Sequence, residues 1–241
     1  MAGFEAWLLK FDGVGLDGAG FDTELGASYE YGRIEYAYSL MARAAGIDMM
    51  PTRLLEEGGR AHFMTRRFDR PGGTRRLHTQ TLCALSILDY NARGVHDYAQ
   101  LFQTIDALGL DESARIEAYR RLVFNWMAAN CDDHTKNHSF VLDDRGHWTL
   151  SPAYDLTHAF NPSGKWTYQH LMSVGGKFSG LTRSDLIEFA ERQGVPAPGV
   201  IIAEVADALG SWSDFAAEAG VTAATTALVR DDFQIEELRR Q

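Results

Sequence analysis

The chain has 241 residues, and its 23 basic and 33 acidic side chains give a formal charge of −10. With 45% hydrophobic and 11% aromatic residues it holds enough apolar material for a packed core, which excludes general disorder. The acidic balance argues against a broad nucleic-acid-binding face, two cysteines cannot form a disulfide framework, and no apolar run is long enough to span a membrane, so a cytoplasmic globular protein is expected.

Two stretches of different character follow one another along the chain. The first is rich in strand patterns, and a polar run over 66–76, broken by Pro71 and two glycines, predicts a hinge after it. The elements expected before the hinge are a strand over 6–11, a glycine-rich loop, a helix over 31–45 and strands over 52–56 and 61–67.

Helical periodicity dominates beyond the hinge. The clearest helix spans 112–130, with Asp111 as its N-cap. The sequence thus predicts an α+β protein with a small part at 1–70 and a larger helical part at 71–241. The other elements expected in the second part are helices over 79–88 and 98–108, a hairpin of 139–142 and 147–150, and helices over 182–193, 200–219 and 223–240.

The densest polar cluster, CDDHTKNHSF, lies between the 112–130 helix and the hairpin. Asp132 and Asn137 have the D-x-x-x-x-N spacing of a phosphotransfer loop, in which the aspartate accepts the proton of the attacking hydroxyl and the asparagine binds Mg²⁺. The hairpin then returns a second carboxylate, Asp155, to the same place. Asn137 and Asp155 supply the hard oxygen ligands that Mg²⁺ prefers.

Two residues upstream complete this pattern. Lys10, near the end of the first strand, can reach ATP phosphates, and Glu35, near the start of the next helix, can pair with it. These five residues, each in the expected element, favour a phosphotransferase over a set of unrelated surface side chains.

Three other interpretations use the same regions. Asp132, Asp133, His134 and His138 can form a transition-metal site, although a change from helix to strand separates the two histidines. The G-x-G-x-x-G string at 13–18 matches a dinucleotide-binding fingerprint, but no helix start follows it. Cys131 has a histidine nearby, yet no Cys-His-Asn arrangement is visible, so a small residue at a helix end is favoured.

Several strings resemble one known family. WLLKFDG, IEYAYSLMARAAGI, FMTRRFDR, VFNWMAANCDDHTKNHSF and LSPAYDL are similar to the C-terminal kinase region of HipA-type proteins, the toxin kinases of HipA/HipB toxin–antitoxin modules. The similarity runs from about residue 7 to 155 and continues more loosely beyond 177. D-D-H-x-K-N and P-A-Y-D-L are its most specific strings.

The resemblance implies a protein-kinase-like fold, with a partial N-lobe at 1–70 and a helical C-lobe at 71–241, and serine/threonine phosphorylation with ATP and Mg²⁺. It implies an aminoacyl-tRNA synthetase as the protein substrate and a HipB-like helix-turn-helix antitoxin as a partner, with no direct nucleic-acid or membrane binding by this chain. Position by position, the implied roles are Asp132 as catalytic base with His134 and Lys136 in its loop, Asn137 and Asp155 as metal ligands, and Lys10, Glu35, Arg66 and Phe68 at the ATP site.

One departure from the family concerns the phosphate-covering loop. Family members usually carry it in a long region before the lysine strand, whereas here only nine residues precede Lys10. A truncated gene product, a misassigned start or a separate N-terminal chain are the expected explanations. The alternative function is a catalytically inactive kinase remnant that binds an antitoxin or another partner.

Overall fold

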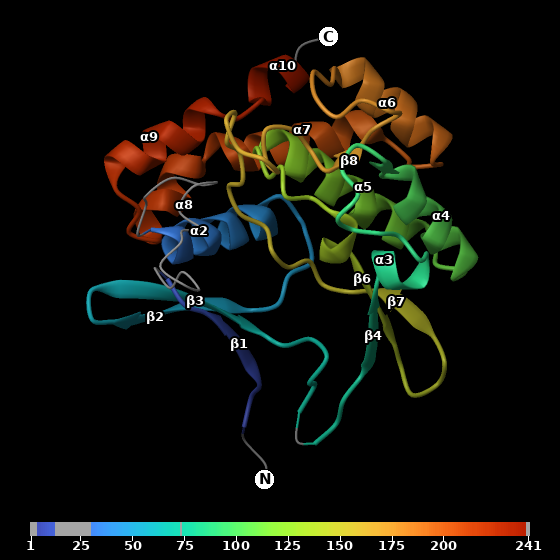
Figure 1. The fold of residues 1–241 in the computed structure, drawn as a ribbon, viewed down its shortest axis with the longest axis horizontal. Helices are drawn as coiled ribbons and strands as arrows, with labels where there is room; N and C mark the ends of the chain where they lie inside the picture. Colours follow the sequence, from blue (N-terminus) through green and yellow to red (C-terminus); the bar gives the residue numbers. More distant parts are fainter. Residues whose placement is uncertain (1–3, 13–29, 73, 240–241) are drawn as a thin grey trace.

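The computed structural model describes residues 4–12, 30–72 and 74–239 (Figure 1). Its first sheet has the order β1-β3-β2 and is antiparallel throughout. Lys10, the last residue of β1, lies opposite Phe63 of β3. The expected strands are therefore confirmed, with the bounds β1 Trp7–Lys10, β2 Thr52–Glu57 and β3 Arg60–Arg66. The G-x-G-x-x-G string lies outside the described residues.

Helix α2, Tyr31–Ala44, connects this sheet to the rest of the molecule. It contacts β2 and β3, and it also packs against the C-terminal helices α7, Pro198–Gly210, and α8, Trp212–Glu218. The Tyr38 hydroxyl donates to the Ala128 carbonyl oxygen over 2.6 Å, deep in the core. One side of α2 thus supports the lysine strand through β3 while the other side belongs to the main core.

Gly32 allows the close approach of α2 to the sheet. A Cβ added at this position would come within 1.9 Å of the Ala61 carbonyl oxygen on β3. Because that neighbour is backbone in a paired strand, it cannot move aside without shifting the sheet.

We expect Gly32→Ala to lower the free energy of unfolding by about 2 kcal/mol or more, as overpacking does in well-packed cores. Gly210→Ala is the matched control, since a Cβ there meets no heavy atom within 4 Å at the end of α7. The control should be neutral or slightly stabilising. Denaturant unfolding measures both, and equal stability of the two variants would contradict the close approach.

The segment after the hinge begins with a strand where a helix was expected. Residues 79–81 belong to β4, His78–Thr81, which pairs with β6, and only α3, Leu82–Leu85, is helical. The prediction of a helix over 79–88 was therefore largely wrong. The second sheet has the order β4-β6-β7, with β6 Ser139–Leu142 and β7 Trp148–Leu150 forming the predicted hairpin.

The remaining helices form the larger part of the molecule. A short parallel pair joins β5, His96–Asp97, to β8, Met172–Ser173. Each of the helices predicted over 200–219 and 223–240 is divided into two in the structure, the first at Ser211 and the second near Asp232. Local turns end the helices at these points, although the apolar pattern continues. The helices are α4 Ala99–Ala107, α5 Glu112–Met127, the 3₁₀ turn η2 Thr135–Asn137, α6 Arg183–Arg192, α9 Ala223–Asp231 and α10 Ile235–Arg239, with α7 and α8 already given.

One hydrophobic cluster runs through α2, α5, α7 and α8, with Trp126, Trp212 and Tyr38 among its largest fully buried side chains. Asp111 caps α5 as predicted, accepting from the backbone N–H groups of Ser113 and Ala114. The polar loop at 131–137 thus follows a helix whose C-terminal half is buried in the core. Within the described ranges, every helix is too short or too polar to cross a lipid bilayer.

Candidate active site

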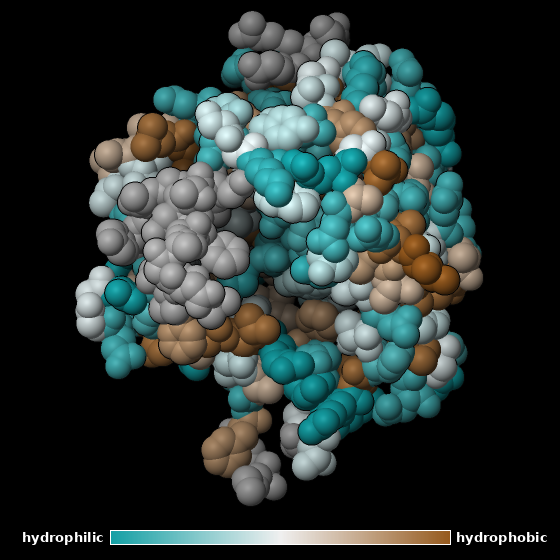
Figure 2. All heavy atoms as spheres, in the orientation of Figure 1, coloured by the Kyte–Doolittle hydropathy of each residue, from teal (hydrophilic) through white to brown (hydrophobic). Residues whose placement is uncertain are grey.

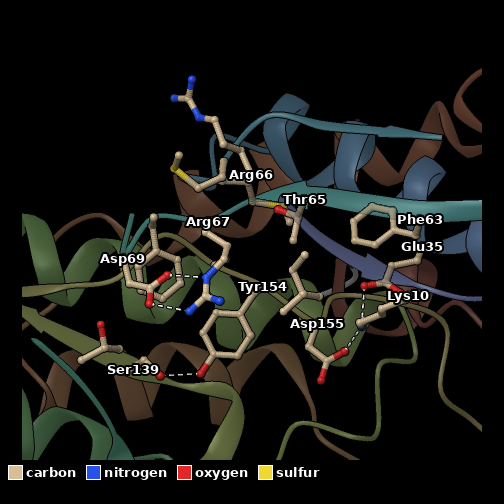
Figure 3. Close-up of a pocket in the computed structure, with 16 residues that line it drawn as sticks. Lys10, Glu35, Phe63, Thr65, Arg66, Arg67, Asp69, Ser139, Tyr154 and Asp155 are labelled. Atoms are coloured by element: carbon tan, nitrogen blue, oxygen red, sulfur yellow. Dashed lines mark hydrogen bonds and ion pairs between the residues drawn. The ribbon is translucent and has the colours of Figure 1, made fainter. Parts of the chain in front are cut away.

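Lys10 brings three parts of the chain together. Its Nζ donates to Glu35 Oε1 of α2 over 2.6 Å, and it also forms an ion pair with Asp155 Oδ1. Figure 3 shows the three side chains pointing toward one another at one end of a cleft. The predicted pairing of Lys10 with Glu35 is present, and Asp155 reaches the same ammonium group.

Asp155 is held at this place by the backbone on either side of it. The Ala153 N–H donates to the Asp48 carbonyl oxygen over 2.7 Å, which ties the segment after β7 to the loop after α2. Asp155 itself has a φ of 59°, in the left-handed region that non-glycine residues seldom adopt. Such a conformation persists only where the surroundings impose it, and it turns the carboxylate toward Lys10.

The charges of this cluster are unbalanced. Burial opposes the charge of Lys10, but Glu35 and Asp155 together raise its pKa above the ordinary value, so the ammonium is retained. Burial raises the pKa of Glu35 to about 7, against the lowering influence of Lys10. Burial, with the charges of Asp155 and Asp133, also raises the pKa of Asp132 to about 7. The Lys10 ammonium thus pairs with two carboxyl groups, Glu35 and Asp155, so this end of the cleft holds more carboxyl groups than its ammonium can neutralise.

The cleft beside Lys10 has a volume of about 380 Å³. In the space-filling view the surface is hollowed near the centre, between the β1–β3 side and the β4–β6 side (Figure 2). Phe68 and Tyr154 stack within it, with ring centroids 6.0 Å apart and an interplanar angle of 27°. Its walls are Leu8, Lys10, Glu35, Met49, Met50, Phe63, Thr65, Arg66, Arg67, Phe68, Asp69, Thr79, Ser139, Ala153, Tyr154 and Asp155.

The composition of these walls changes from one end to the other. Aliphatic, methionine and aromatic side chains line the middle of the cleft. Lys10, Glu35 and Asp155 close one end, and residues 66–69, from the start of the predicted hinge, lie at the other end. Arg67 is fixed there by two hydrogen bonds to Asp69, of 2.8 and 2.7 Å. A flat apolar ring with a charged tail matches such a cleft. Arg66 and Phe68, predicted at the ATP site, are both in its wall.

The loop after α5 carries the other predicted residues, and they lie outside that wall. Asn137 Nδ2 donates to the Asp132 carbonyl oxygen over 2.9 Å, which closes the loop and leaves the amide oxygen as the atom able to bind a cation. His134 Nε2 lies 3.6 Å from Asp132 Oδ1, and its Nδ1 accepts from the Lys136 N–H over 3.3 Å. The charge of Asp155 contributes to the raised pKa of Asp132.

Lys136 is exposed rather than directed into the cleft. Its Nζ lies 4.4 Å from the centroid of the Tyr90 ring, a cation–π contact. Its carbonyl oxygen accepts from the Tyr154 hydroxyl over 2.8 Å, so its backbone is tied to the cleft while its side chain is not. The role of Lys136 in the catalytic loop, which the family resemblance implies, stays a prediction.

The transition-metal alternative has no support in the described residues, where no three His, Cys, Asp or Glu side chains are grouped to hold a metal. Asp133 is buried and engaged by His170, Tyr98 and backbone N–H groups. Burial lowers the pKa of His138 to about 3 and leaves it neutral in the core. The roles of Tyr98, Tyr154 and His170 were not predicted. Each lies beside a polar residue in the sequence, and no local pattern distinguishes these rings from others in the chain.

The family follows from comparison with known proteins. The model of the HipA-like C-terminal domain matches residues 1–213 of the 241. This chain belongs to that family. The resemblance seen in the sequence is therefore confirmed.

Two relatives from Sinorhizobium fredii carry kinase names. "Putative kinase Y4dM" is 31% identical over 141 residues, which are 51% of this chain and 32% of the relative. "Putative kinase Y4mE" is 27% identical over 125 residues, 48% of this chain and 30% of the relative. The matched part of this HipA-like chain is thus about a third of each relative's length. Family and names together support a kinase-like function.

Two solved structures have the same fold. HipA of Shewanella oneidensis, solved with HipB and operator DNA, superposes with a TM-score of 0.65 at 19% identity, over 86% of this chain and 57% of that one. The Helicobacter pylori proinflammatory kinase CtkA gives a TM-score of 0.57 at 11% identity, over 98% of this chain and 90% of that one. At these identities the likeness concerns the fold, and the expected kinase-like α+β architecture is confirmed.

Proposed function

We propose that this HipA-like chain is a serine/threonine protein kinase core that transfers the γ-phosphoryl group of ATP to a protein hydroxyl. The observation that carries the proposal is the convergence of Lys10, Glu35 and Asp155 at one end of a cleft whose middle is apolar. A nucleotide has the matching polarity, with a flat base at one end and phosphates at the other. The division into a partial N-lobe at 1–70 and a C-lobe at 71–241 is part of the same proposal.

At the ATP site, Lys10 binds phosphate oxygens and Glu35 holds its ammonium group in place. The ion pair is favourable for this purpose because Glu35 is nearly inaccessible to water while Lys10 is partly exposed toward the cleft. Arg66 and Phe68 line the place of the adenine ring, where Phe68 is already supported by its stack on Tyr154. Positioning of this kind accounts for most of the catalysis in phosphoryl transfer.

Asn137 and Asp155 would hold Mg²⁺. The Asp155 carboxylate and the amide oxygen of Asn137, whose Nδ2 donates to the Asp132 carbonyl oxygen, are hard oxygen ligands of the kind that Mg²⁺ takes. When bound, Mg²⁺ neutralises phosphate charge and orients the transferred group. Asp155 keeps its own negative charge available, since Lys10 holds its pKa below the ordinary range despite burial.

Asp132 accepts the proton of the attacking hydroxyl in this proposal. Its side chain is 43% exposed, so a substrate can reach it, and the loop hydrogen bond from Asn137 fixes its backbone. His134 lies beside it, and Lys136 belongs to the same loop on the exposed side. A raised pKa makes Asp132 a stronger base than an ordinary carboxylate once it is ionised.

The partners proposed for this chain come from its relatives. The Shewanella HipA was solved with HipB and operator DNA, which supports a HipB-like helix-turn-helix antitoxin as partner. The family resemblance suggests an aminoacyl-tRNA synthetase as the phosphorylated protein, a toxin role and a cytoplasmic location.

Titration calorimetry with ATP and Mg²⁺ tests the nucleotide site. The wild-type chain should bind, and Lys10→Met should lower the affinity at least tenfold because the phosphates lose their ammonium partner. Lys177→Met is the matched control, since Lys177 forms an ion pair of 2.8 Å with Asp185 on the surface. Absence of binding by the folded wild-type chain, or equal binding by Lys10→Met, would contradict the proposal.

A further inference from the structure

Two consecutive carboxylates in the loop after α5 have opposite surroundings. Asp132 is partly exposed, whereas the side chain of Asp133 is fully buried. Asp133 accepts four hydrogen bonds, from the Tyr98 hydroxyl at 2.9 Å, His170 Nδ1 at 2.9 Å, and the backbone N–H groups of Leu171 at 2.8 Å and Met172 at 3.4 Å. A carboxylate with this many donors cannot turn toward a substrate without leaving all of them unpaired.

The charge of Asp133 is balanced inside the core. Burial by itself would lower the pKa of His170, but the Asp133 carboxylate raises it to about 10, which favours the imidazolium form beside the carboxylate. The indole of Trp126 lies parallel to this ring, with centroids 4.0 Å apart and an angle of 11°. The pair is therefore both neutralised and packed, the condition under which a buried ion pair fixes a geometry.

The same pair joins the loop to distant parts of the chain. Tyr98, which directly precedes α4, accepts through its hydroxyl from Asn125 Nδ2 of α5 over 3.0 Å. Asn125 Oδ1 in turn accepts from Asn130 Nδ2 over 2.9 Å. A network of buried polar groups thus connects the loop with α4, α5 and the entry to β8.

A second set of contacts lies on the other side of Asp132. The Cys131 N–H donates to the Ala159 carbonyl oxygen over 3.0 Å, and the Ala159 N–H donates to the Ala129 carbonyl oxygen over 3.1 Å. The chain downstream of Asp155 therefore contacts the loop before Asp132 through Ala159, and after Asp132 through the segment at 170–172 that binds Asp133. The backbone of Asp132 thus has hydrogen-bonded neighbours in either direction.

From these contacts we infer that Asp133 is a positioning residue, whose four hydrogen bonds hold the loop so that Asp132 faces Asp155 and the cleft. The inference rests on the proposed kinase function and assigns to Asp133 a role that differs from that of its neighbour. Displacement of a reacting group by about 1 Å can lower a rate about 10²-fold, so the hold on the loop has a measurable consequence.

Two variants separate geometry from charge. Asp133→Ala removes all four acceptor contacts, whereas Asp133→Asn keeps an oxygen for the backbone N–H groups and can donate to a neutral His170. We measure ADP release from MgATP with dephosphorylated casein as acceptor. We expect kcat to fall about 10- to 100-fold in Asp133→Ala and less in Asp133→Asn, with the dissociation constant for MgATP within about threefold of wild type.

Asp232→Ala is the matched control. His158 Nε2 and Asp232 Oδ2 form a less buried pair of 2.8 Å that does not include Asp133, so this variant can lose stability without losing kcat per folded molecule. A folded Asp133→Ala that keeps kcat within about threefold would overturn the inference, as would a parallel fall in kcat and MgATP affinity. If Asp133→Ala does not fold, Asp133→Asn decides: a lowered kcat at unchanged KM supports the inference, and an unchanged kcat overturns it.

An inactive wild-type chain that still binds MgATP would count against the proposed function and not by itself against the role of Asp133. Amide hydrogen exchange over 131–137 then gives the answer. Exchange should be faster in Asp133→Asn than in Asp232→Asn if Asp133 holds the loop, and equal rates would overturn the inference.

Discussion

Asp132→Asn is expected to lower the rate of phosphoryl transfer from MgATP by about 10² to 10⁴, because the amide cannot accept the hydroxyl proton. The side chain keeps its size, and the backbone is held by Asn137 and by the contacts of Asp133. ATP binding should change little, since Asp132 is outside the wall of the cleft. Transfer to casein, measured beside calorimetric binding, separates the two effects.

The same variant has a predicted effect on stability that depends on pH. Burial, Asp155 and Asp133 raise the pKa of Asp132 from 3.8 to about 7 in the folded state. Between these values the folded protein binds more protons at this site than the unfolded chain, so the free energy of unfolding decreases as pH rises. Asparagine does not titrate. The melting temperature of Asp132→Asn, relative to that of wild type, should therefore be higher at pH 8 than at pH 4.5.

Asp144→Asn serves as control for both measurements, because Asp144 is exposed in the turn between β6 and β7 and pairs with Arg75. It should leave transfer and its pH dependence as in wild type. Retained transfer in Asp132→Asn would refute the base assignment. A melting-temperature difference that is the same at pH 4.5 and pH 8 would show that Asp132 is not destabilised by its surroundings.

The local elements that carry the site could be predicted because their signals are short-range. Asp111, as an N-cap residue, predicts the start of α5, and the apolar face of that helix indicates its length. The turn residues after β6 predict the hairpin. The pairing of Lys10 with Glu35 came from motif order and element type together. The position of Lys10 in its strand and of Glu35 in its helix was enough to predict that the two side chains lie near each other.

The parts that could not be predicted depend on contacts far apart in the chain. Residues 79–81 form a strand because they pair with β6, whereas their own sequence pattern is also compatible with a helix. Asp133 and Asp132 are indistinguishable by type, and distant donors such as Tyr98 and His170, 37 positions downstream, make one of them structural. The left-handed backbone of Asp155 likewise follows from its surroundings. Sequence patterns identified the chemical groups, whereas tertiary contacts assigned their roles.

Asp155→Asn is expected to remove the Mg²⁺-dependent part of ATP binding. Asparagine adopts the left-handed backbone of this position as readily as aspartate and is close to it in size, so the substitution tests charge with little added strain. The neutral amide can still accept from Lys10, but it is a much weaker ligand for a divalent cation.

Titration with ATP in the presence of Mg²⁺ and then of EDTA gives the measurement. In wild type we expect Mg²⁺ to raise the affinity at least tenfold, and in Asp155→Asn the two titrations should agree within about threefold. Asp155→Ala should behave likewise but melt at a lower temperature, since alanine gains no local hydrogen bond to offset the positive φ. Asp144→Asn should keep the full response to Mg²⁺. An undiminished response in Asp155→Asn would remove Asp155 from the metal site, and its carboxylate would then act only as the ion-pair partner of Lys10.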